Sequence, residues 1–148
     1  MKAVIQRVSS ASVTVENTIV SQIKEGYLLL LGVAHEDTDT DIDYLLKKTI
    51  GLRIFPDEDK NMNLSLQEAG GSVLVVSQFT LCADTRKGRR PSFIHAAPPE
   101  KAEKFYLKFC SSLEEHGVSV EKGAFGAMMQ VQLTNEGPVT IVLDSRNP

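Results

Sequence analysis

The sequence has few cysteines, no long apolar segment and no excess of positive charge. Its two cysteines, Cys82 and Cys110, are too few for a disulfide framework and lack the spacing of metal ligands. The longest apolar run, residues 27–33, is far shorter than the roughly 20 residues of a membrane helix. Gln6 and Arg7 interrupt the start of the chain, where a signal peptide would continue its apolar stretch. We therefore expect a protein of the reducing cytoplasm with no membrane partner.

Charge and aromatic content limit the kinds of nucleic-acid binder that fit. The chain has 16 basic and 19 acidic residues, a net charge of −3, and 6% aromatic residues. Proteins that hold nucleic acid by its phosphates are normally basic, so an RNA partner must be bound by a local patch. The low aromatic content weighs against a module that binds single-stranded RNA by stacking its bases.

Length and composition indicate one globular domain. The 148 residues are close to the roughly 150 of a single domain. Hydrophobic residues make up 42% of the chain and charged residues 24%, as in ordinary globular proteins. We expect one domain over residues 1–148, with a core that needs no disulfides.

Two kinds of periodicity occur along the chain. Short alternating segments predict a strand meander at residues 5–8, 12–15, 19–23 and 27–33. Helical spacing predicts helices over residues 39–50 and 99–116. Further strands are expected at 52–55 and 62–66 as a hairpin, at 72–77, and at 128–134 and 139–143. Together they predict a compact α+β domain with a β-meander or barrel-like sheet and two main helices.

The acidic segment after residue 56 has part of the spacing of a calcium loop. Asp57, Asp59, Asn61 and Glu68 fall at the ligand positions, but Met62 stands where the turn needs glycine. No helices are expected on either side, so we interpret the segment as a solvated hairpin tip. The three histidines are far apart in sequence and have no second ligand at a suitable spacing. We expect no metal site and no cofactor.

Hydroxyl and thiol side chains cluster where the strand at 72–77 ends. Ser77, Thr80 and Cys82 are candidate nucleophiles there, since α+β domains often carry chemistry at strand ends. The spacing is also common in strands without any activity. Cys82 has no histidine nearby in sequence and is better interpreted as a half-buried structural cysteine.

A charged loop at residues 83–98 contains a quarter of the basic residues within five positions. Arg86, Lys87, Arg89 and Arg90 form this cluster. In an acidic molecule, a lone basic loop would concentrate an anionic ligand at one place, so it could hold phosphates. The alternative is a solvated loop.

Two stretches of the chain, GGSVLVVSQFTLCADTRKGRRPSF and NEGPVT, resemble the signature sequences of the D-aminoacyl-tRNA deacylases, also known as D-tyrosyl-tRNA deacylases. The resemblance extends to IQRVSSASVTV near the start, to residues 52–55 and to MQV at residues 129–131. It covers nearly the whole chain, and the SQFTL and GPVT pair is highly specific. Cys82 departs from the small residue expected at its position, without disturbing the motif.

The resemblance implies a cytoplasmic homodimer that hydrolyses the ester joining a D-amino acid, or glycine, to the 3′ end of tRNA. It implies that the aminoacyl ester and the terminal adenosine lie in a pocket lined by Ser77, Gln78, Phe79 and Thr80. It further implies that Gly137 and Pro138, joined by a cis peptide bond, reach into the active site of the other subunit. A rigid backbone wall there would admit only hydrogen on the L side of the α-carbon.

Two more residues are expected to bind substrate, and the basic loop to bind tRNA. Arg7, a charge in an otherwise apolar strand, could donate hydrogen bonds to carbonyls of the Gly137–Pro138 segment, although an ordinary edge-strand arginine fits equally well. Met129 lies in the third matching stretch. We assign Arg86, Lys87, Arg89 and Arg90 to tRNA binding.

The residues leave two mechanisms open. An ester needs an activated nucleophile and donors for the developing oxyanion, which backbone N–H groups near Phe79 and Thr80 could supply. Thr80 could attack directly, or the substrate's 2′-hydroxyl could orient or deprotonate a water while the protein supplies positioning. We favour the second, because no base for Thr80 is visible. A non-catalytic RNA-binding module is the main alternative function, and an amidase or peptidase using Thr80 or Cys82 is another.

Overall fold

A long hairpin at the amino terminus organises the sheet. The computed structural model describes all 148 residues. The second half of strand β1 (Lys2–Val15) pairs antiparallel with β2 (Thr18–Ile23), and its first half pairs antiparallel with β3 (Gly26–Gly32). The two turn residues between β1 and β2 both have positive φ, as a two-residue hairpin turn requires. The sequence predicted two strands where β1 is one, because exposed serines interrupt the apolar pattern without interrupting the ladder.

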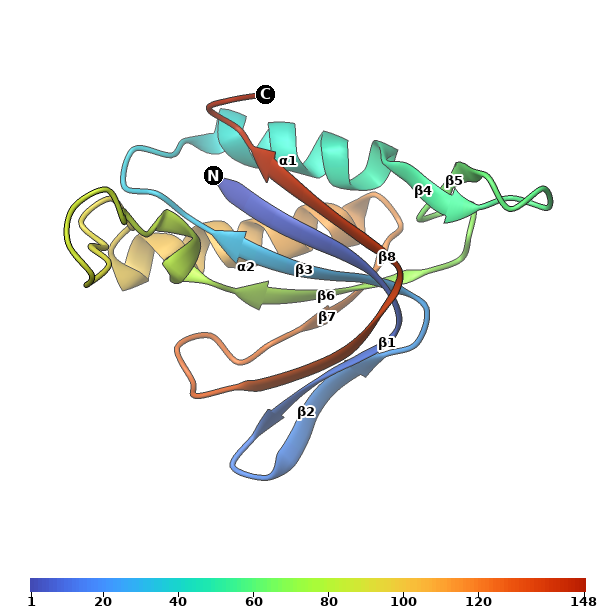
Figure 1. Cartoon of the computed structure of the whole chain (residues 1–148), viewed down its shortest axis with the longest axis horizontal. Helices are drawn as coiled ribbons and strands as arrows, with labels where there is room; N and C mark the ends of the chain where they lie inside the picture. Colours follow the sequence, from blue (N-terminus) through green and yellow to red (C-terminus); the bar gives the residue numbers. More distant parts are fainter.

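The sheet continues through parallel neighbours rather than as a simple meander. Strand β6 (Ser72–Ser77) lies parallel to β3, and β7 (Ser119–Lys122) lies parallel to β6. Parallel strands need long crossover connections, and the two helices lie in these connections. Strand β8 (Gln130–Asp144) pairs with the other edge of β1. The mixed sheet curls into a nearly closed barrel, which confirms the predicted barrel-like α+β domain (Figure 1).

Helices α1 (Asp39–Gly51) and α2 (Pro99–Glu115) cover one face of the sheet. The main hydrophobic core joins their apolar stripes to every second residue of β3 and β6. The intervening residues of these strands form a second, smaller cluster on the opposite face, inside the curl of the sheet. Both strands are therefore buried on both faces, which explains their continuous apolar sequences. No helix is both long enough and apolar enough to cross a membrane.

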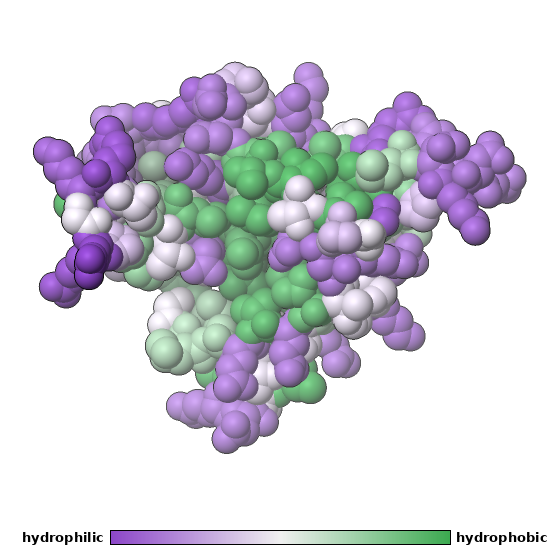
Figure 2. Space-filling model, in the orientation of Figure 1, coloured by the Kyte–Doolittle hydropathy of each residue, from purple (hydrophilic) through white to green (hydrophobic).

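The remaining elements include one confirmed prediction and two corrections. Strands β4 (Arg53–Pro56) and β5 (Met62–Ser65) form the predicted hairpin, and Asp57 accepts backbone N–H bonds at its tip. The prediction of two final strands at 128–134 and 139–143 is wrong, because β8 continues through the segment between them. Strand β7 was not predicted, since it is short and mostly exposed. Apolar residues gather over the strands on the face shown in Figure 2, surrounded by hydrophilic residues.

Candidate active site

The chain turns sharply where β6 ends, and the turn carries the first predicted motif. After Gln78 it enters a short 3₁₀ helix, η1 (Phe79–Cys82). The N–H of Gln78 donates to the carbonyl of Leu31 at 2.8 Å, which fixes the turn to the end of β3. Gly32 allows the close approach, because a Cβ there would lie 2.9 Å from the side chain of Leu81. The turn is thus held by a buried strand on one side and projects its own side chains outward.

The side chains of this turn form one local group. The amide Nε2 of Gln78 donates to Oγ1 of Thr80 at 2.5 Å. Thr80 is exposed and Ser77 half-buried, and no histidine or carboxylate makes a hydrogen bond to the Thr80 hydroxyl. An amide donor cannot accept a proton, so the contact orients Thr80 and does not activate it. Phe79 meets Phe93 edge to face, with 5.1 Å between the ring centroids.

Cys82 does not have the environment of a nucleophile. Its Sγ lies 3.5 Å from the carbonyl of Val33, and its side chain is buried. Burial, with Asp37 adding to the effect, raises the pKa of the thiol. Cys82 is therefore held as a neutral thiol, in agreement with its interpretation as a structural cysteine.

The second motif lies on β8 and has the expected cis bond between Gly137 and Pro138. Both residues are exposed. Gly137 has φ +125°, and a Cβ there would lie 2.8 Å from Cγ2 of Val139 and 3.0 Å from Nη2 of Arg7. Arg7 Nε donates to the carbonyl of Glu136 at 3.2 Å. The segment is therefore packed closely against Arg7, and the hydrogen bond considered from the sequence is present.

Within one chain the two motifs lie apart. Gly32, which packs against η1, pairs with Lys2 of β1. Arg7, which contacts Gly137, lies farther along β1 and pairs with Tyr27. Positions 2 and 7 of β1 are five residues apart, about 17 Å along a strand. A single copy therefore does not bring the GPVT segment to η1.

Met129 lies on the side of the first motif. Its sulfur and the side chain of Val76 both lie against Gly123. A Cβ added to this glycine would lie 3.1 Å from the Met129 sulfur and 3.5 Å from Cγ2 of Val76. Val76 directly precedes Ser77. The structure thus brings Met129 to the end of β6, close to the Ser77–Thr80 turn.

The basic loop is fastened at its base and exposed at its tip. Asp84 and Ser92 exchange two backbone hydrogen bonds, of 2.8 and 3.0 Å. Arg86 binds Asp84 with two side-chain hydrogen bonds, of 2.9 and 2.6 Å, and holds the pKa of that carboxyl well below its usual range. The other three cations of the cluster are exposed and have no hydrogen-bonding or ionic partner: Lys87, Arg89 and Arg90. We predicted the same tRNA-binding role for all four residues, but in the structure Arg86 differs from the other three because it already pairs with Asp84, two residues away.

Comparison with known proteins identifies the family. The family model described as D-Tyr-tRNA(Tyr) deacylase matches residues 4–144. The chain belongs to this family. A D-aminoacyl-tRNA deacylase of Desulfatibacillum aliphaticivorans is 57% identical over 146 residues, 99% of this chain and 100% of that protein. One from Bacillus pumilus (strain SAFR-032) is 58% identical over 146 residues, 99% of each chain.

A solved structure extends the comparison to the fold. The c-Myc DNA unwinding element binding protein superposes with a TM-score of 0.92 and is 42% identical, with 97% of this chain and 98% of that chain covered. The similarity to this structure therefore extends over nearly the whole architecture described above. The residues matched by the family model, 4–144, include both stretches, at η1 and on β8.

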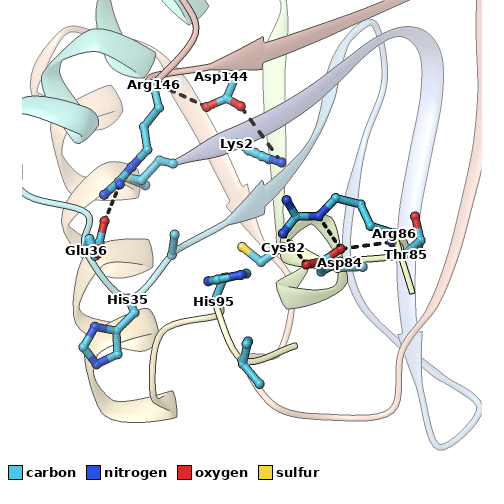
Figure 3. A pocket seen from close by; sticks show the side chains of 14 residues that line it. Lys2, His35, Glu36, Cys82, Asp84, Thr85, Arg86, His95, Asp144 and Arg146 are labelled. Carbon is cyan, nitrogen blue, oxygen red and sulfur yellow. Dashed lines mark hydrogen bonds and ion pairs between the residues drawn. The ribbon is translucent and has the colours of Figure 1, made fainter. Parts of the chain in front are cut away.

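A cavity of about 850 Å³ opens beside η1 in this deacylase-family chain (Figure 3). Its walls come from five separate segments: residues 1–2, 34–36, 82–86, 94–95, and 144 with 146. Of the residues singled out from the sequence, Cys82 and Arg86 line it, and residues 77–80 do not. No local sequence pattern predicts the cavity, because each segment contributes only two to five residues.

Proposed function

We propose that this protein hydrolyses the ester bond between a D-amino acid and the 3′ end of tRNA, and that it also removes glycine. The observation that carries the proposal is the family match over residues 4–144, together with relatives above 50% identity named for this activity. The products are free tRNA and the free amino acid. The substrate places the enzyme in the cytoplasm, where tRNA is charged and used.

The turn at the end of β6 holds the ester and the terminal adenosine. Ser77, Gln78, Phe79 and Thr80 line this pocket, and Met129 closes it from the side. A water molecule attacks the ester carbonyl, the bond to the ribose oxygen breaks, and the water's proton ends on that oxygen. The substrate's own 2′-hydroxyl orients the water, because Thr80 has an amide partner and no base. Accurate positioning alone can supply roughly 7–11 kcal/mol of a barrier.

Chirality is decided by the Gly137–Pro138 backbone. Inverting the α-carbon exchanges its hydrogen with the side chain, so a wall on the L side admits a D-amino acid or glycine and rejects an L-amino acid. Arg7 supports this wall through the Glu136 carbonyl. A clash with fixed backbone discriminates more strongly than the about 1–3 kcal/mol available from one methyl group in a pocket.

The wall belongs to a second copy of the chain. The separation of Gly137 from η1 along β1 supports this arrangement, since one chain cannot bring them together. Exposed apolar residues on the same strand as the wall, Leu133 and Val142, give a second copy a surface on which to pack. The complete site therefore requires the homodimer.

The test is an assay of ester loss from D-tyrosyl-tRNA and L-tyrosyl-tRNA, each compared with its spontaneous hydrolysis. We expect rapid loss of the D-ester and no acceleration for the L-ester. Binding of tRNA without ester loss would instead indicate an RNA-binding module. Cleavage of an amide-linked analogue of the substrate would indicate an amidase, which the buried, neutral Cys82 disfavours.

A further inference from the structure

The geometry points to the cavity beside η1 as the binding site for the nucleotide that precedes the terminal adenosine of the RNA. Its phosphodiester lies against Lys2, Arg86 and His95. The inference rests on the proposed function, because the substrate must be an RNA whose last ribose carries the ester.

The position of the cavity supports this assignment. Cys82 and Ala83 line it and follow Thr80 by two and three residues. Two residues of a 3₁₀ helix span about 4 Å along the axis, so the cavity opens directly next to the Thr80 turn. The ribose that carries the ester is joined through its 5′ carbon to the preceding phosphodiester. When the last ribose of the RNA lies at Thr80, the phosphodiester on its 5′ carbon therefore lies near the cavity mouth.

The charges of the cavity fit a nucleotide better than a bare anion. Figure 3 shows Lys2, Arg86 and His95 around the middle of the cavity, with Asp84 and Asp144 beside them. A free phosphate ion would be repelled by these carboxylates. A nucleotide offers its phosphate to Lys2, Arg86 and a ring N–H of His95, and the N–H groups of its base to the carboxylates, which are the acceptors suited to the amino group of cytosine. The volume, about 850 Å³, lies within the roughly 300–1,000 Å³ usual for ligand pockets.

The walls are fixed before any ligand arrives. The N–H of His35 donates to the carbonyl of His95 at 2.9 Å, and Lys101 Nζ donates to the carbonyl of His35 at 2.6 Å. The N–H of Ala97 donates to the carbonyl of Val33 at 3.0 Å. The wall that carries His95 is therefore tied to the end of β3, and little ordering is needed on binding.

Lys2 and Arg86 are both accessible to a ligand. The Arg86 side chain is 81% exposed, and the Lys2 ammonium lies 4.0 Å from Asp144, at the limit of an ion pair. Because the Arg86–Asp84 pair is open to solvent, Arg86 can turn from Asp84 toward a phosphodiester oxygen while water solvates the carboxylate.

The experiment compares two D-alanyl esters, one of adenosine and one of the trinucleotide CpCpA. Wild-type protein should have the higher kcat/KM for the trinucleotide ester. In the variant Lys2→Ala/His95→Ala, the ratio of the two kcat/KM values should fall about tenfold through KM, which is the effect of losing one charge-assisted hydrogen bond. Lys2→Arg should retain the ratio, and Lys47→Ala, which removes an exposed lysine of α1, serves as the control. An unchanged ratio, or an equal fall for both esters, would overturn the inference.

A binding titration tests the nucleotide site independently of activity. Uncharged CpCpA should bind wild-type protein more tightly than the Lys2→Ala/His95→Ala variant, and inorganic phosphate should not displace it. Equal affinities for the two proteins, or displacement by phosphate, would contradict the nucleotide site. If neither ester is hydrolysed by wild-type protein, the proposed function fails, while this titration still decides whether the cavity binds a nucleotide.

Discussion

The hydroxyl of Thr80 has an amide as its hydrogen-bond partner, and this limits its part in catalysis. Oγ1 accepts from Gln78 Nε2 and has no base beside it. We expect Thr80→Ala to keep most of kcat, since the hydroxyl only positions its surroundings. Thr80→Tyr should abolish activity by filling the pocket, whereas Thr18→Tyr, at an exposed position of β2, should not. Single-turnover rates measure these effects, and a trapped acyl-Thr80 intermediate would refute the water mechanism.

Gly137 combines a positive φ with close neighbours, so it should not tolerate a side chain. A Cβ there would meet Val139 at 2.8 Å and Arg7 at 3.0 Å. Gly137→Ala should push the wall out of place and lower kcat/KM for D-alanyl-tRNA by at least about tenfold, the equivalent of 1.4 kcal/mol. Gly126→Ala is the matched control, because Gly126 has φ +74° with open space around it. It should cost about 1 kcal/mol of stability and leave the rate unaffected. Similar losses of activity in both variants would argue against the wall.

Among the elements, the basic loop should govern the salt dependence of tRNA binding. Replacing Arg86, Lys87, Arg89 and Arg90 together by serine should raise KM and flatten the plot of log Kd against log salt concentration. The slope should decrease by about 0.7 for each phosphate of a single strand that the loop no longer neutralises. Lys47→Ser, on the outside of α1, provides the control. An unchanged slope would mean that the loop is merely solvated.

Helix α1 begins with a capping box that predicts a pH-dependent stability. Burial alone would raise the pKa of Asp41, but hydrogen bonds from Ser145 Oγ and from the N–H of Thr38 outweigh it and lower the pKa to about 2. The contribution is present above the unfolded pKa and is lost as the pH falls toward 2. Asp41→Asn should cost about 1 kcal/mol of unfolding free energy at pH 7 and clearly less at pH 2, where the carboxyl is half protonated. Urea unfolding measures this, with the exposed Asp43→Asn as control. An equal cost at both pH values would contradict it.

How well each element could be predicted depends on how local its signal is. The helix predicted at 39–50 is Asp39–Gly51, and the one at 99–116 is Pro99–Glu115, because apolar stripes and end signals lie within the helices themselves. Strand β7 has only four residues, and its pairing with β6 joins distant segments, so nothing local identifies it. The continuity of β8 was hidden for a similar reason, since glycine and proline within it are typical of a turn.

In the whole molecule, one part of the candidate site can be predicted from a sequence motif, and another part is formed only when distant segments fold together. The turn after Ser77 is contiguous in sequence and could be recognised there. The cavity beside it draws on both ends of the chain, so no stretch of sequence contains its pattern. The distance between η1 and Gly137 also emerges only from the strand register, and it is the reason we propose that a second copy supplies the wall.

The most direct test of the account compares wild-type rates on D-alanyl-, glycyl- and L-alanyl-tRNA. The three substrates differ only in which position on the α-carbon, if any, carries a methyl group. If fixed backbone excludes the L side chain, the D-alanyl and glycyl esters are cleaved and the L-alanyl ester survives. The glycyl rate should then exceed the L-alanyl rate by more than the roughly 10–200-fold, about 1–3 kcal/mol, that hydrophobic contact with one methyl provides. Cleavage of L-alanyl-tRNA as fast as glycyl-tRNA would show that no such wall exists.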